Sequence, residues 1–167
     1  MTTTIVLKSL AALSACGLAA SILIYVESLT GPAVDDTHLV FAFSLGAIAA
    51  HIPMYVRERS SLKDRTFYWT GFGRGKPGWV VPLVKLFWLV ALAHGVWFFV
   101  QGHHAVPVIQ DGQMILSSRG RVVKVLTQGE YLKLRAQELR GFAALMIACY
   151  LTPAMYWWFP RNHQEPD

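Results

Sequence analysis

Four long apolar runs constrain the fold of this chain more than any other feature. They cover approximately residues 5–26, 38–56, 80–101 and 141–159. Each run has about the 20 residues that an α-helix needs to cross roughly 30 Å of hydrocarbon. None alternates between apolar and polar residues as the strands of an outer-membrane barrel do. Because a backbone inside lipid has to satisfy its own hydrogen bonds, the runs predict four membrane-spanning helices.

The composition agrees with this assignment. Of the 167 residues, 54% are hydrophobic and only 15% are charged, whereas about a quarter of the residues in a soluble domain are charged. The length fits one domain. We therefore predict an all-α membrane protein, a four-helix bundle in a single domain over residues 1–167, with both chain ends on the same side of the membrane.

The charges in the connectors predict an orientation. The loop between the second and third runs carries six cations, whereas the loop between the first and second has no Lys or Arg. The positive-inside rule then predicts a bacterial inner-membrane protein with both ends in the cytoplasm and residues 103–140 in the periplasm. This last segment also carries six cations, which opposes the assignment, but the early helices usually set the orientation.

The long polar segment between the third and fourth runs contains two local patterns. Residues 112–126 are two β-prone runs around Gly120, which predicts a β-hairpin. Thr127 and Glu130 then form a capping box, the signature of a helix start. A helix over residues 128–159 would be about 48 Å long, roughly 15–20 Å more than the hydrocarbon needs. We expect the hairpin to lean on this extension, since an isolated hairpin is marginal in water.

This hairpin and the basic face of the extended helix are the predicted interaction surface. The residues assigned to it are Gln113, Ile115, Arg119, Arg121, Lys124, Lys133 and Arg135. Two interpretations stay open. The segment is either a structural cap over the bundle or a docking site for another protein or a second copy.

Two histidines lie inside predicted helices, where ionisable residues are costly and often functional. His51 and His94 facing each other would be able to hold a haem. They lie about 13 and about 7 residues below the same end of the bundle, an offset of about 9 Å at 1.5 Å per residue. That offset is awkward for the two faces of one porphyrin, so the favoured interpretation is a neutral, hydrogen-bonded histidine packed between helices.

A second group of polar residues lies where two predicted helices meet the same rim of the bundle. Its members are Asp35, Asp36, His38, His103 and His104. Carboxylates and imidazoles suit Zn²⁺ or another transition metal, but no fixed spacing connects them. Ordinary solvated side chains are the favoured interpretation. We predict no cofactor, with haem and a transition metal as the alternatives.

Cations and aromatic residues mix at the end of the bundle assigned to the cytoplasm. The predicted lipid-contact residues are Arg57, Arg59, Lys63, Arg65, Trp69, Arg74, Lys76, Trp79, Trp157 and Trp158. Beside a membrane this mixture places rings at the interface and cations on anionic headgroups. Membrane lipid is therefore the expected partner here, and nucleic acid is not.

Small residues recur on the first two predicted helices. Ala11, Ala15 and Ala19 form one ridge, and a second holds Gly46 between alanines four positions away on each side. Because lipid tails are as apolar as Leu, membrane helices associate where small residues let backbones approach. The ridges predict close packing of the first hairpin or self-association.

These features favour a non-enzymatic protein that acts by protein–protein contact, an accessory or assembly subunit or an immunity-type protein. Its size and topology support this by analogy only. One alternative is an oligomeric channel or small transporter, although no carboxylate lies within the four runs as a proton-coupled carrier usually requires. The other is a haem- or metal-binding redox protein that uses the histidines.

Overall fold

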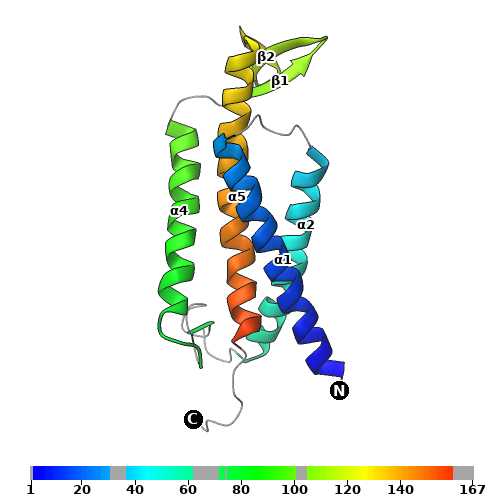
Figure 1. Cartoon of the computed structure of the whole chain (residues 1–167), viewed down its shortest axis with the longest axis vertical. Coiled ribbons are helices and arrows are strands. Elements are labelled where there is room, and N and C mark those ends of the chain that lie inside the picture. The colour runs from blue at the N-terminus through cyan, green and yellow to red at the C-terminus, as the bar shows by residue number, and fades with distance from the viewer. Residues whose placement is uncertain (1, 31–36, 62–71, 74, 101–104, 160–167) are drawn as a thin grey trace.

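The computed structural model describes residues 2–30, 37–61, 72–73, 75–100 and 105–159. Within the helices it leaves the side chains of residues 2–5, 7, 30, 37–40, 58–61 and 98–99 outside the description. The described residues form four helices and three strands (Figure 1). The helices are α1 (Thr2–Thr30), α2 (Thr37–Ser61), α4 (Val80–Val100) and α5 (Gln128–Trp158). The strands are β1 (Val106–Gln110), β2 (Gln113–Ser118) and β3 (Arg121–Val125).

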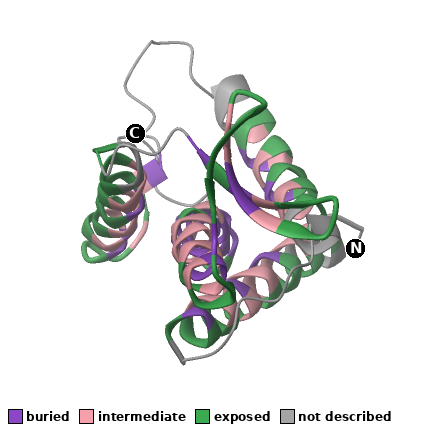
Figure 2. Cartoon of the chain, turned by 90° about the horizontal axis from the view of Figure 1, so that it is seen from above, coloured by how far each residue is buried: buried purple, intermediate pink, exposed green. Residues whose placement is uncertain are grey.

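Helix α5 is the centre of the bundle. It packs against α1, α2 and α4, and α1 also packs against α2. The described parts of α2 and α4 share hardly any contacts, so α4 is held mainly through α5. Seen from above, α4 stands on one side of α5, with α1 and α2 on the other (Figure 2). Helix α1 begins and α5 ends at the end of the bundle away from the sheet (Figure 1).

Three of these helices are long and apolar enough to cross a membrane. The candidate spans are Lys8–Leu29 in α1, Val80–Trp97 in α4 and Gln128–Trp158, which is α5. The outward faces of α1 and α4 expose large apolar side chains, such as Leu23 at 63% and Leu89 at 65%. Such faces are unfavourable in water and favourable against lipid tails. The prediction of a mostly helical chain is confirmed. Three of its helices have the length and apolar composition of membrane spans, and α2 stays a prediction as the fourth.

Helix α5 begins where the capping box predicted. The Glu130 N–H donates to Thr127 Oγ1 at 3.3 Å, and the Thr127 N–H donates to the Glu130 carboxylate at 2.9 Å. Two of the amide groups that lack an intrahelical partner are satisfied in this way. The first turns of α5 continue above the bundle and carry the sheet (Figure 1). The extended fourth helix is therefore confirmed.

The Glu130 carboxylate also receives a hydrogen bond from Lys124 Nζ on β3 at 2.6 Å. This bond, and then the two from Thr127, lower the pKa of Glu130 from about 4.5 to about 2. The pKa of Glu130 is lower in the folded state than in the unfolded state. The hydrogen bonds of its carboxylate therefore stabilise the fold fully above about pH 4.5, and this stabilisation is lost as the pH falls toward 2.

Replacing Lys124 by Met is expected to raise the pKa of Glu130 toward its ordinary value, because the largest cause of the depression is removed. Titration of the Glu130 carboxyl carbon by NMR measures this directly. Arg121→Met, which removes another exposed cation of the same strand, is the control and should leave the titration unchanged. A Glu130 pKa near 2 in both variants would contradict the assignment to Lys124.

The three strands form an antiparallel sheet in the order β1-β2-β3. The predicted hairpin is present as β2 and β3, but the prediction missed β1. Asp111 and Gly112 have φ values of 51° and 75°, and Arg119 and Gly120 have 51° and 77°. Two central residues at positive φ are typical of the type I′ turn, for which Asp-Gly is a favoured pair. The predicted hairpin began at Gly112, so the turn at Asp111 and Gly112 was missed.

The sheet packs on the first turns of α5 through a small apolar core. Ala105, Leu116, Leu126 and Tyr131 are buried there. The Leu126 N–H donates to the Met114 carbonyl at 2.7 Å and ties the end of β3 to β2. A three-stranded sheet that buries one set of side chains against a helix has the support that a free hairpin lacks.

Candidate functional site

Two surfaces of the molecule are candidates for function. The first is the β3 edge of the sheet. Strand β3 is at the edge of the strand order, and all five of its residues are exposed. Three of them are valines, with exposed fractions of 56% for Val122, 59% for Val123 and 62% for Val125. An edge strand presents unpaired backbone groups that can pair with another extended segment.

The residues of the predicted interaction surface are not equivalent in the structure. Gln113, Arg119, Arg121 and Lys133 are exposed. Lys124 is exposed but bonded to Glu130, and Arg135 is half-buried and pairs with Glu138. Ile115 is 3% exposed, so its assignment to the surface was wrong. It occupies the central strand, where neighbouring strands flank it on both sides.

The second surface is an apolar groove between α4 and α5, here called the α4–α5 groove. Its upper part has a volume of about 460 Å³ and lies between the α4 residues Leu92 and Gly95 and the α5 residues Gly141 and Leu145. A second cavity of about 770 Å³, the lower part of the groove, is lined mainly by α2 and reaches α5 at Cys149 and Thr152. Trp88 lines both parts. The groove exists because α2 and α4 both contact α5 but hardly contact each other.

Trp88 is fixed in the floor of this groove by a hydrogen-bond chain. Its Nε1–H donates to Thr152 Oγ1 at 3.0 Å, and the Thr152 hydroxyl donates to the Ala148 carbonyl at 2.9 Å. Thr152 is 1% exposed. Since buried polar groups are costly without partners, this chain holds the indole in one orientation.

An ion pair lies at the upper end of the groove, where Glu138 is one of the lining residues. Arg135 donates to the Glu138 carboxylate at 2.9 Å, and their side chains are 25% and 18% exposed. Glu138 lines the groove together with Gly95 of α4. The mouth therefore joins a cation and an anion to an otherwise apolar channel.

The two histidines lie in different parts of the groove. His51 lines the lower part and His94 the upper part. Each Nδ1 lies within hydrogen-bond distance of the carbonyl four residues earlier, Ala47 for His51 at 2.9 Å and Val90 for His94 at 3.0 Å. His94 Nε2 lies 3.5 Å from the Tyr25 hydroxyl. This geometry suits hydrogen-bonded histidines packed between helices, and it does not bring the two histidines together on one cavity.

The predicted metal residues are mostly outside the described part of the chain. Asp35, Asp36, His103 and His104 lie there, and for His38 only the backbone of α2 is described. Among the residues that the structure does describe, no three of His, Cys, Asp or Glu are placed to hold a metal ion.

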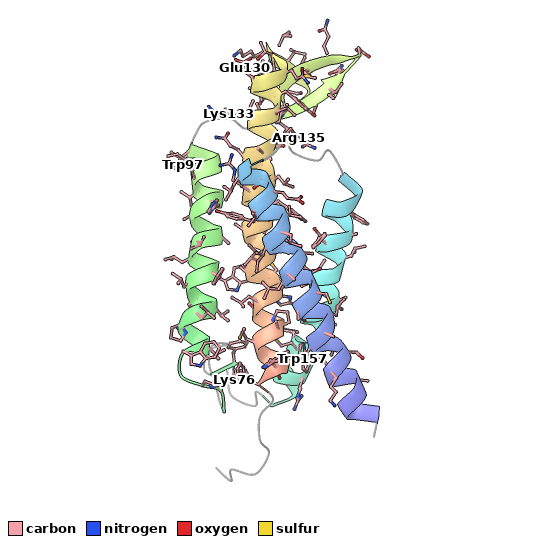
Figure 3. All side chains as sticks on the ribbon, in the orientation of Figure 1. Lys76, Trp97, Glu130, Lys133, Arg135 and Trp157 are labelled. Carbon is pink, nitrogen blue, oxygen red and sulfur yellow. The ribbon has the colours of Figure 1, made fainter. Side chains whose placement is uncertain are left out.

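Of the predicted lipid-contact residues, Lys76 has a structural role. Its Nζ donates to the Phe159 carbonyl at 3.0 Å and lies 4.6 Å from the centre of the Tyr156 ring. A cation at the C-terminus of a helix compensates the exposed carbonyl groups, so Lys76 caps α5 (Figure 3).

The tryptophans divide between surface and interior. Trp79 and Trp158 are exposed at 52% and 67%, as lipid contact requires, but Trp157 is 6% exposed. Trp157 packs in the apolar core with Val84 and Leu151, so its assignment to lipid was wrong. The remaining predicted cations and Trp69 lie outside the described side chains, except Arg57, which is half-buried on α2.

Two features of the bundle were missed by the sequence analysis. Ser14, Ser21 and Ser28 are buried at spacing seven on α1, and each hydroxyl donates to a carbonyl of its own helix. Their spacing was the available signal, because a heptad repeat marks a packed helix face. Gly17 of α1 and Gly46 of α2 both lie against Tyr150 of α5, a contact between distant segments that no local pattern indicates.

No family model matches this chain, and neither a curated protein nor a solved structure shows significant similarity to it.

Proposed function

We propose that this chain is a small inner-membrane protein that acts without catalysis by binding another protein through β3. The observation that carries the proposal is the fully exposed edge strand with three valines on it. An extended segment of a partner would add to the sheet at β3, with backbone hydrogen bonds for affinity and the valines for specificity. The membrane bundle would hold this edge at a fixed distance above the lipid.

The exposed side chains of α2 support a fourth membrane span. Phe41, Leu45, Ile48 and Ile52 follow one face at helical spacing and are each more than half exposed. Helix α2 lies beside α1 and α5 within the same bundle. If α2 crosses the membrane with the other three, both ends of the chain lie on one side and the sheet on the other. The cations of the loop after α2 then favour a cytoplasmic location for the ends.

A single charge on β3 tests the partner site. Val123→Asp places a carboxylate on the edge without entering a core, since Val123 is 59% exposed. The matched control is Val106→Asp on β1, the opposite edge of the sheet, where Val106 is 46% exposed. Proteins retained by the tagged chain from native membranes would be quantified for the parent and both variants.

The expected result is a protein that the parent and Val106→Asp retain equally and Val123→Asp loses. Circular dichroism and amide exchange of the sheet would show that both variants fold. If no protein distinguishes the two variants, β3 is not a binding edge and the proposal is wrong.

A further inference from the structure

We infer that the α4–α5 groove binds one phospholipid with a primary ammonium headgroup, a phosphatidylethanolamine. One acyl chain would lie along α5, and the headgroup would rest on the Arg135–Glu138 ion pair. This inference goes beyond the partner contact at β3. It uses the membrane placement of the bundle but none of the residues of β3.

The groove has the shape for an acyl chain. On α5 the upper cavity is lined by Glu138, Phe142 and Leu145 and the lower one by Cys149 and Thr152. These five positions alternate at spacings of four and three residues, so they share one face of the helix. From Glu138 to Thr152 the helix rises about 21 Å. One leaflet contributes about 15 Å of hydrocarbon, so this stretch of α5 is longer than one leaflet is deep. Since both cavities are lined almost entirely by apolar side chains, an acyl chain is the expected occupant.

The mouth of the groove lies at the level of the headgroups. Gly95 and Glu138 line the same upper part, and Trp97 is 63% exposed two residues after Gly95. The span Val80–Trp97 is about 27 Å long at 1.5 Å per residue, close to the hydrocarbon thickness. Exposed tryptophans concentrate at the membrane interface. Trp97 and Arg135 lie near one another in height at the sheet end of the bundle (Figure 3).

The ion pair selects the headgroup. The pair places a guanidinium, which donates hydrogen bonds, beside a carboxylate, which accepts them. The phosphate would accept from Arg135, and the ammonium would donate to Glu138. Such charge-assisted bonds are stronger than neutral ones. A phosphatidylglycerol would bring no cation to Glu138, and a choline headgroup has no N–H to donate.

The experiment measures which lipids remain bound. The full chain is placed in nanodiscs with equal amounts of ethanolamine, choline and glycerol phospholipids that share the same acyl chains. After release into mild detergent, native mass spectrometry counts the lipids on each protein. We expect one ethanolamine lipid to be retained in preference to both others.

A glycine pair on α5 supplies the matched variants. Gly141 lines the groove and a Cβ there would meet nothing within 4 Å, so Gly141→Leu fills the groove without a clash at its Cβ. Gly129→Leu is the same change in the first turn of α5, again in open space but outside the groove. In Gly141→Leu the acyl chain loses its place in the groove, so the amount of ethanolamine lipid retained should fall roughly tenfold, the ratio that corresponds to about 1.4 kcal/mol. Gly129→Leu should retain as much of this lipid as the parent chain.

The headgroup contact has its own variant. Glu138→Gln keeps the shape and removes the charge that receives the ammonium. It should abolish the preference for ethanolamine over choline.

Equal retention of the three lipids by the parent chain would overturn the inference, and so would equal retention by Gly141→Leu and Gly129→Leu. A dimer that Gly141→Leu alone disrupts would show a second copy in the groove and overturn it too. Val123→Asp should not change lipid retention, so this inference and the proposal for β3 fail independently.

Discussion

Replacing Gly17 by Ala is expected to destabilise the bundle by about 1–3 kcal/mol, the usual cost of forcing an extra group into a packed core. A Cβ at position 17 would overlap the ring carbons Cδ1 and Cε1 of Tyr150. Tyr150 is 3% exposed and cannot move outward, because its hydroxyl donates to the Phe43 carbonyl at 2.8 Å. Unfolding in mixed detergent micelles, followed by circular dichroism, would measure the loss.

The control for this prediction is Gly95→Ala, the same substitution in α4 where a Cβ meets nothing within 4 Å. There the change should be neutral or should stabilise by up to about 1 kcal/mol, the helix propensity of Ala over Gly. If Gly17→Ala behaves like Gly95→Ala, the packing of α1 on α5 is not as described.

A double-mutant cycle separates the two glycines that contact Tyr150. A Cβ at Gly46 would meet the Tyr150 hydroxyl oxygen closely, whereas its nearest ring carbon is 3.6 Å away. Tyr150→Phe should therefore rescue most of the loss in Gly46→Ala and little of the loss in Gly17→Ala. Equal rescue of both variants would contradict this assignment of contacts.

Replacing Tyr131 by Ala is expected to release the sheet from α5, at a cost of about 3–5 kcal/mol to that part of the molecule. Tyr131 is 5% exposed and packs with Leu116 of β2 and with Leu126. The core beneath the sheet is small, so the loss of its largest side chain leaves little to hold three short strands in place. Amide exchange of β1, β2 and β3 would rise.

The bundle supplies the internal control for this variant. Tyr131 lies in a cluster separate from those around Tyr150 and Trp157, so amide exchange in the lower half of α5 should not change. Lys133→Ala, an exposed position two residues away, should leave the sheet protected. Uniform loss of protection throughout the chain would mean that the sheet and the bundle unfold as one unit.

The two candidate surfaces were accessible to sequence reasoning to different degrees. β-prone runs and a glycine turn predicted β2 and β3, because strand pairing across a tight turn is a local property. The α4–α5 groove had no sequence signal. Its lining comes from helices that are apolar on every side, and a void between them depends on how far apart they pack. Arg135 was assigned to the interaction surface from its charge, but only its contact with Glu138 places it at the mouth of the groove.

The sequence by itself determined the helical character of this chain, the start of α5 at its N-cap Thr127 and the hairpin of β2 and β3. Each of these follows from the length of an apolar run or from residues within a few positions of each other. Only the tertiary structure decided that Tyr150 lies between Gly17 and Gly46, that Trp157 points inward and that β1 completes the sheet. In a helix without a polar face, apolar residues look alike to lipid and to a neighbouring helix. Which of them become buried is decided by the shapes that meet when the bundle closes.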